Sequence, residues 1–133
     1  GVYCINSVNS SINFYSTGRS MSNDTIQEIE RNIKQAKSLV ENGDALERLK
    51  NNKDFKKIIL DGFFEKEAIR LVHLKADRNM QSVDTQKSIL TQMDAVGALH
   101  QYFNVIFIQA NQASKSIAAD EEARDELLAE ELE

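Results

Sequence analysis

The chain is 133 residues long, which favours a single domain with a modest core. It is 41% hydrophobic and 28% charged, ordinary values for a folded protein, which argues against wholesale disorder. Proline is absent and glycine occurs only five times, so helices can run long without interruption. No stretch approaches the ~20 apolar residues that span a bilayer, and no charged-then-apolar signal segment opens the chain. We therefore expect a soluble, helical protein that makes no contact with a membrane.

The net charge of −5 is unevenly distributed along the chain. Residues 120–133 contain eight acids and one base, Arg124, and thus carry −7. The 119 residues before them therefore carry +2, so a nearly neutral body is followed by an acidic end. Binding to a phosphate backbone depends on clustered lysine and arginine. This balance disfavours nucleic acid as a partner.

The first twenty residues differ from the rest of the chain. They contain no acid and one base, Arg19, and their apolar residues keep neither a helical period nor strand alternation. Three interpretations stay open: a non-native leader upstream of a start at Met21, a genuine arm that adds a strand to a neighbour, or a packed part of the domain. The lone cysteine, Cys4, cannot form an internal disulfide, which fits a reducing compartment or a virion interior. Residues 21–133 are expected to form a single helical domain.

The first helix is predicted at residues 24–42. Asp24 and Gln27 have the spacing of a capping box, in which each side chain satisfies a free backbone N–H at the helix start. Gly43 is expected to end this helix in a left-handed conformation, and a short helix should follow and end at residues 51–52. Spacings of three and four create one apolar stripe from Ile26, Ile29, Ile33, Ala36 and Val40.

A second long helix is predicted from residues 52–54 to about Ala76. Gly62 lies in its interior, where glycine costs ~1 kcal/mol relative to alanine. Its presence indicates either close approach of another helix or a kink, and we prefer close approach. Residues 77–82 then form a turn, with Ser82 as the N-cap of the last helix. At 1.5 Å per residue, the earlier helices are roughly 30–35 Å long each.

The last helix is predicted from Val83 to about Leu128, because no breaker interrupts it, and would span roughly 70 Å. Its apolar positions advance by alternating four and three, as in a heptad seam: Ile89, Met93, Val96, His100, Phe103, Phe107, Ala110, Ser114 and Ile117. The earlier helices are too short to cover this helix unaided. The uncovered part must therefore fray, bend or be buried by another chain.

The run from Tyr102 to Ile108 is apolar around nearly the whole helix circumference and needs neighbours on several sides. It is either the centre of a monomeric bundle or a subunit interface, because only two other substantial helices exist to surround it. The candidate interface residues are Ile89, Met93, Val96, His100, Phe103, Val105, Phe107 and Ile108.

Signals for catalysis and metal binding are missing from the sequence. There is no Gly-rich phosphate loop and no Gly-x-Ser-x-Gly motif. His100 is expected to be a buried, neutral histidine with one hydrogen bond. His73, the only other histidine, lies on a different predicted helix without a cysteine or carboxylate pair at ligand spacing. We predict no enzyme activity, no catalytic residue, no cofactor and no metal site.

The one basic cluster surrounds the predicted break between the first helices. Lys50, Lys53 and Lys57 could share a helix face and touch phosphate, but acids lie among them and no aromatic platform accompanies them for base stacking. A solvated face is therefore preferred over contact with nucleic acid or with an acidic protein. The acidic end, residues 118–133, is interpreted as a frayed helix end, with docking onto a basic partner and mimicry of nucleic acid as alternatives.

Part of the sequence resembles a known family. The stretch ALERLKNNKDFKKIILDGFFEKEAIRLVHLKADRNMQS, which begins at Ala45, resembles a family of small tailed-bacteriophage proteins, and the pieces QMDAVGALHQYF and DELLAEELE look similar to the rest of it. The likeness extends from Met21 to the C-terminus. It implies a phage-encoded protein that is associated with the virion or has no assigned role, and it carries over no catalytic or binding residue.

We therefore predict an all-α fold, a helical hairpin or three-helix arrangement with one long C-terminal helix and a coiled-coil-like seam. The predicted function is a non-enzymatic phage structural or assembly protein, a head, neck or internal virion component, that acts through helix-mediated subunit contacts. Its partners would be copies of itself or other virion proteins, and its location the virion or the host cytoplasm. The alternatives are an early phage protein that binds and inhibits or redirects a host protein through its acidic end, and a nucleic-acid packaging factor.

Overall fold

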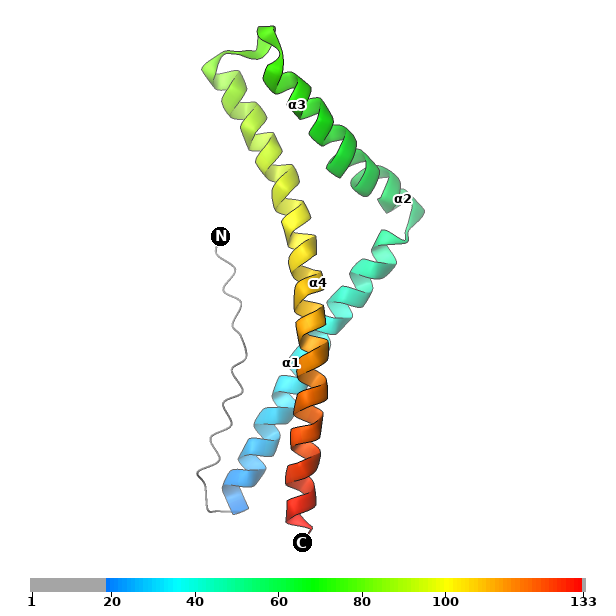
Figure 1. Cartoon of the computed structure of the whole chain (residues 1–133), viewed down its shortest axis with the longest axis vertical. Coiled ribbons are helices and arrows are strands. Elements are labelled where there is room, and N and C mark those ends of the chain that lie inside the picture. Colours follow the sequence, from blue (N-terminus) through cyan, green and yellow to red (C-terminus); the bar gives the residue numbers. More distant parts are fainter. Residues whose placement is uncertain (1–18, 133) are drawn as a thin grey trace.

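The computed structural model describes residues 19–132, with side chains from Asn23 onward (Figure 1). Within this range every regular element is a helix, so the predicted all-α fold is confirmed. The three interpretations of residues 1–20 concern a segment outside the described residues, except that Arg19 and Ser20 open the first helix. The elements are α1 (Arg19–Lys50), α2 (Lys53–Phe55), the π-helix η1 (Lys56–Glu67), α3 (Ala68–Ala76), the 3₁₀-helix η2 (Arg78–Met80) and α4 (Val83–Glu131).

The helices form a hairpin with one broken arm and one continuous arm (Figure 1). The broken arm consists of α1 followed by α2, η1 and α3, and α4 returns antiparallel along both parts of it. With 49 residues, α4 is ~74 Å long at a rise of 1.5 Å per residue. Its N-terminal half packs against α3 and η1, and its C-terminal half packs against α1. Within the described chain, each level of α4 therefore has one neighbouring helix.

The broken arm is longer than predicted. α1 alone has 32 residues, or ~48 Å, and the helical segment after the break continues without interruption to Ala76. The lengths predicted for the earlier helices are too small, because the two parts of the broken arm together extend along one side of α4. The opposite side has no helix against it in the part of the chain that the structure describes.

The prediction that Gly43 ends the first helix is wrong, because α1 runs through this residue to Lys50. Asp24 accordingly lies inside α1 and not at its cap. None of the described glycines has a positive φ, so Gly43 does not adopt the left-handed conformation of a helix stop. It is buried against α4, where an added Cβ would lie 2.5 Å from the Cβ of Ala110. Gly43 is a packing glycine that lets the two helices approach closely.

The break in the arm lies at residues 51–52, as predicted. The side-chain oxygen of Asn52 accepts hydrogen bonds from the backbone N–H groups of Asp54 and Phe55, both at 3.0 Å. Asn52 is thus the N-cap of α2, and it satisfies two N–H groups that have no partner inside the helix. This cap lets the chain change direction and start a new helix within two residues.

The segment after α2 is a π-helix over residues 56–67, with hydrogen bonds from residue i to residue i+5. The interpretation of Gly62 as a point of close approach by another helix is wrong. An added Cβ there would meet only the carbonyl group of Lys57 in η1 itself, with its oxygen at 3.1 Å. The wider turn allows the adjacent Phe63 and Phe64 both to pack against the core between α3 and α4.

The turn at residues 77–82 is confirmed, and side chains hold it. Ser82 is the N-cap of α4, and its hydroxyl accepts a hydrogen bond from the backbone N–H of Thr85 at 3.2 Å. The side-chain amide of Gln86 donates to the carbonyl oxygen of Met80 at 2.7 Å. These contacts close the hairpin at this end.

The core is one seam wide and has two parts. Between α1 and α4, the predicted apolar stripe is confirmed through Ala36, and Val40 is half-buried. In this part of the core, Ala113 is buried on α4, and the buried hydrophobic residues on α1 are Ile26, Ile29, Ile33, Ala36 and Leu46. Between α3 and α4, Leu71, Ile89 and Val96 are buried, and the half-buried residues around them are Phe63, Phe64, Ala68, Leu74, Met80 and Met93.

Replacing Gly43 by alanine should destabilise the hairpin despite the higher helix propensity of alanine. The new methyl group would collide with Ala110, and overpacking of this kind typically costs about 1–3 kcal/mol. Gly97→Ala is the matched control, since an added Cβ there meets nothing within 4 Å. Alanine at that helix-interior site should stabilise by about 0.5–1 kcal/mol. Urea denaturation followed by circular dichroism measures both; a Gly43→Ala protein as stable as Gly97→Ala would contradict the close contact.

Candidate protein-interaction site

α4 has an inner seam and an outer side that repeat with the same period. The inner residues Ile89, Val96, Phe103, Ala110 and Ile117 are seven apart and are buried or half-buried. A residue five positions further along a helix lies on nearly the opposite side. The residues on that side are all exposed, and we call them the outer stripe: Lys87, Asp94, Gln101, Ile108, Lys115 and Glu122.

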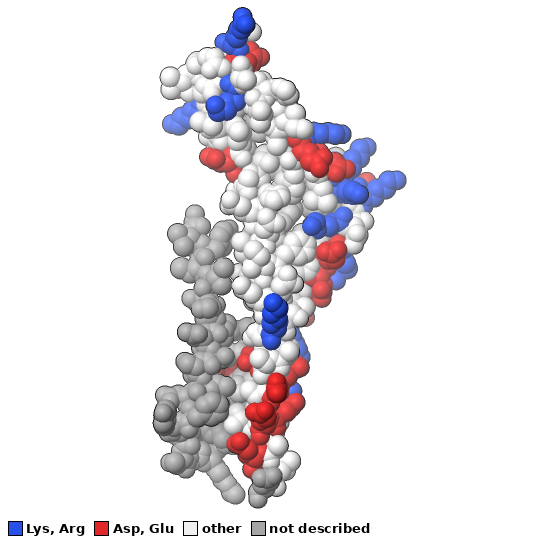
Figure 2. Space-filling model, in the orientation of Figure 1, with Lys and Arg blue, Asp and Glu red and all other residues white. Residues whose placement is uncertain are grey.

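The middle of this outer side is nearly free of charge. Between Lys87 and Lys115, Asp94 is the only aspartate, glutamate, lysine or arginine. A surface helix normally places charged residues opposite its apolar stripe, so a span of roughly 40 Å with one such charge is unusual. Figure 2 shows an uncharged surface across the middle of the molecule, between basic and acidic regions. The lack of charge is visible in the sequence, but the heptad pattern drew attention to the inner seam instead.

The apolar run at residues 102–108 is only partly covered. Tyr102 is 49% exposed and Ile108 is 48% exposed, while Phe103, Val105 and Phe107 are half-buried. The helices of the described chain cover this run on the side of Phe103 and Phe107, while Tyr102 and Ile108 each keep about half of their surface exposed.

The candidate interface residues separate into two groups. Ile89 and Val96 are buried within the chain and Met93 packs against them, so these three belong to the intrachain seam. Phe103 and Phe107 also turn towards the broken arm. Val105 and Ile108 are the two apolar candidates that a second chain could reach from the outer side. Towards the C-terminus the seam follows Ala113, which is buried, and leaves the predicted Ser114 exposed.

Aromatic side chains fill the space between the elbow of the broken arm and α4. The ring of Phe103 lies 5.9 Å from that of Phe55 and 5.6 Å from that of Phe64, measured between centroids. His100 is exposed and not buried as predicted. Its ring meets Phe64 edge-on at 5.2 Å, because the seam at this level passes to Phe103 and the imidazole lies at its margin. Its Nδ1 atom lies 3.4 Å from the side-chain amide nitrogen of Asn104.

The basic residues of the predicted patch lie on both sides of the break. Lys50 ends α1 and is half-buried, with its ammonium group 4.5 Å from the centre of the Phe107 ring. Lys53 and Lys57 are exposed on α2 and η1, and Figure 2 shows lysine and arginine gathered over this elbow. Aromatic rings do lie beside the patch, although the sequence predicts no aromatic platform for base stacking there. The aromatic rings beside it are used by packing within the chain, through the cation–π contact of Lys50.

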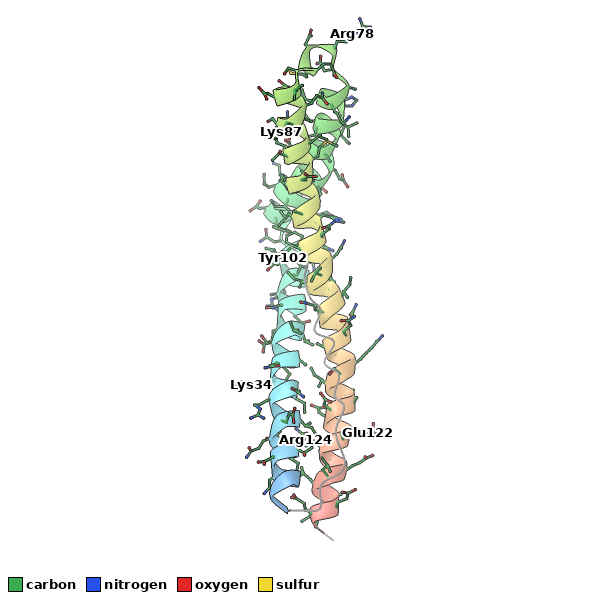
Figure 3. The ribbon with its side chains drawn as sticks, turned by 90° about the vertical axis from the view of Figure 1, so that its left-hand side faces the viewer. Lys34, Arg78, Lys87, Tyr102, Glu122 and Arg124 are labelled. Atoms are coloured by element: carbon green, nitrogen blue, oxygen red, sulfur yellow. The ribbon has the colours of Figure 1, made fainter. Side chains whose placement is uncertain are left out.

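The acidic end contains one carboxylate that is not on the surface. Asp120 is 6% exposed, and its carboxylate accepts a hydrogen bond from Ser116 at 3.4 Å. Gly43 lies level with Ala110, and the two helices are antiparallel. Ten residues further along α4, Asp120 therefore lies level with Ile33, ten residues earlier on α1. Glu122, Asp125 and Glu126 after it are exposed, and Figure 3 shows Glu122 and Lys34 pointing away on opposite sides of the hairpin. Lys34 therefore does not cover the acidic surface of α4.

No site for a metal ion and no membrane span appears in the described range. Within residues 19–132, no group of three or more histidine, cysteine, aspartate or glutamate side chains could hold a metal ion. No helix in this range is long and apolar enough to cross a membrane. The pKa of Glu67 is lowered by its hydrogen bonds from Arg70, a pair on the exposed surface of the broken arm.

Comparisons with protein-family models, with curated proteins and with solved structures found no match to this chain. The likeness to tailed-phage proteins therefore rests on the sequence pieces alone.

Replacing Phe103 by alanine should destabilise the chain far more than replacing its neighbour Tyr102. Phe103 joins the broken arm to α4 through Phe55 and Phe64, and truncation of a core phenylalanine costs about 3–5 kcal/mol when it is fully buried. We expect about 2–3 kcal/mol for this half-buried ring, on that scale, and less than about 1 kcal/mol for the exposed Tyr102. Chemical denaturation of the two variants is the measurement. Equal losses would show that the aromatic contacts do not hold the arm.

Proposed function

We propose that this chain is a non-enzymatic bacteriophage structural or assembly protein that acts through helix-mediated subunit contacts. Its working surface is the outer side of α4 between Lys87 and Lys115, and its partner is protein, either further copies of the chain or other virion proteins. The protein would act in the virion or in the host cytoplasm during assembly. The phage context draws on the resemblance that begins at Ala45, and the mode of contact draws on the geometry of α4.

The observation that carries the proposal is the one-sided packing of α4. Its outer side exposes Leu90, Tyr102 and Ile108 while one charge, on Asp94, occupies roughly 40 Å of helix. Covering apolar surface is favourable by about 25 cal/mol per Å². Covering a surface without charges also avoids the cost of removing ions from water. Both contributions favour docking of another helix on this side.

A second candidate function is supported by the acidic end of α4. Glu122, Asp125, Glu126 and Glu130 are exposed there, and Figure 2 shows acidic side chains gathered over this region. Such a surface attracts basic proteins over distances of about a Debye length, ~8 Å at physiological salt. This favours the alternative of a phage protein that binds and redirects a basic host protein.

The variant Ile108→Glu should weaken association of the chain with its assembly partner by tenfold or more, about 1.4 kcal/mol. The change places a charge on the outer side of α4 and leaves the inner seam intact. Ile58→Glu on η1 is the matched control, because Ile58 is also exposed, at 63%, but lies on the other arm. Incorporation of each variant into phage particles and their assembly intermediates, in competition with the original chain and with circular dichroism to verify the fold, is the measurement. Equal effects of the two variants would contradict a role for the outer side of α4.

Mass spectrometry of purified phage particles separates the two candidate functions. A structural or assembly role predicts the chain in particles or in their assembly intermediates, and predicts its loss from them in Ile108→Glu. A host-directed role predicts one host protein in pull-downs with the full chain, lost when Glu122 and Glu126 are replaced by glutamine and unaffected by Ile108→Glu. Finding the chain only in that host complex would overturn the first function.

A further inference from the structure

We propose that the outer stripe of α4 binds the same stripe of a second copy of this chain, in antiparallel orientation and in one register. In this register Asp94 of each copy lies level with Lys115 of the partner subunit. The inference rests on the proposed function and deepens it by naming the partner, the orientation and the alignment.

The charges along the outer stripe are antisymmetric. At intervals of seven residues, from Lys87 to Glu122, they read positive, negative, neutral, neutral, positive, negative. Reading the stripe backwards therefore replaces every charge by its opposite. Two copies that run in opposite directions match Lys87 with the partner's Glu122 and Asp94 with the partner's Lys115. Each of these pairs occurs twice, so four complementary contacts form across the interface.

The four charged side chains are available for these contacts. All four are exposed, and within the described chain none of them forms an ion pair. Figure 3 places Lys87 and Glu122 near the two ends of α4. The inner pair, Asp94 and Lys115, is 21 residues apart, or ~32 Å along the helix. The described chain thus offers no competing partner for either end of the stripe.

The two neighbouring antiparallel registers bring like charges together, and a shift by fourteen residues places the charges opposite Gln101 and Ile108. A shift by seven residues in one direction places Lys87 level with the partner's Lys115. A shift in the other direction places Asp94 level with the partner's Glu122. Like charges in contact across an interface cost affinity and exclude the wrong alignment. The charge pattern therefore selects one antiparallel register.

Parallel arrangements are also disfavoured. A parallel pair in register places each charge against itself. A parallel pair staggered by seven residues matches opposite charges, but it forms each contact once and leaves a free stripe at both ends. Such a head-to-tail contact produces open chains, whereas the antiparallel pair closes as a symmetric dimer.

The centre of the antiparallel interface is free of charge. Gln101 lies level with the partner's Ile108, and Asn104 lies level with the partner's Val105. An apolar and amide centre with charges towards the ends is the usual anatomy of a protein interface. Further out, Asp84 would lie level with the partner's Asp125, which already contacts Arg124 in its own chain at 3.4 Å. One helix face per copy is a small interface, so we expect a weak, concentration-dependent dimer that weakens as salt is raised.

Charge reversal tests the register. Asp94→Lys and Lys115→Asp should each raise the dimer Kd of the full chain tenfold or more, because each turns two attractive contacts into repulsive ones. The combined variant restores opposite charges and should return to within about threefold of the original Kd. An equal mixture of the two single variants should likewise form a mixed dimer. Asp44→Lys and Lys37→Asp on α1 are charge-matched controls at exposed positions and should leave the Kd unchanged. Sedimentation equilibrium is the measurement.

A distance measurement tests the orientation. Spin labels at Ala119→Cys, in a chain with Cys4→Ser, would lie ~44 Å apart along the axis of the antiparallel dimer. A parallel pair in register would bring them within about 15 Å, since packed helices lie 8–10 Å apart.

The outcomes distinguish this inference from the proposed function. A dimer that is insensitive to both charge reversals, or a short label distance, would overturn the register or the orientation. A chain that stays monomeric at every concentration would overturn the second copy as occupant. Neither result touches the proposed function, which fails separately if the chain is missing from particles and assembly intermediates.

Discussion

A long helix can be covered on all sides only by several neighbours, and α4 has one neighbouring helix at each of its levels within the described chain. The two parts of the broken arm follow one another along the same side of α4, so they lengthen the seam without widening it. Among the residues whose burial the structure describes, burial is accordingly confined to one line, and Leu71 is fully removed from water. The exposed outer side of α4 follows from this arrangement, as does our assignment of the interaction surface.

The features that could be predicted from the sequence are those set by neighbouring residues. The turn at residues 77–82, the cap at Ser82 and the break at residues 51–52 depend on side chains that bond to backbone within a few positions. The extent of α4 follows from the lack of breakers. At Gly43 the sequence does not distinguish a helix stop from a close helix contact, because glycine suits both and only the partner, Ala110, identifies which one is present. The π-helix has no sequence period of its own that could reveal it.

For the candidate site, the sequence pointed to α4, the helix that carries our proposed interaction surface, and to some of the residues on its outer side. Val105 and Ile108 are accessible from the outer side, whereas Ile89 and Val96 are used inside the chain. The heptad pattern could not separate these roles, because it gives the period of a seam and not the number of chains that share it. His100 is expected to be buried but lies at the surface, and Asp120, in the acidic end that is expected to be solvated, is buried. When a helix is packed along one line only, the residues beside that line are at the edge of the core. Whether such a side chain is buried or exposed then depends on a difference of one position along the helix.

The contact between Gly43 and Ala110 also constrains how this protein can diverge. The two backbones leave room for one methyl group between them. The contact therefore limits the summed volume of the two side chains, and it does not limit the volume at each position separately. A larger residue on α1 has to be accompanied by a smaller one on α4, or the crossing of the arms must move. Homologous chains should therefore show paired substitutions at these two sites. The exposed positions of α1 are not limited in this way and can vary independently.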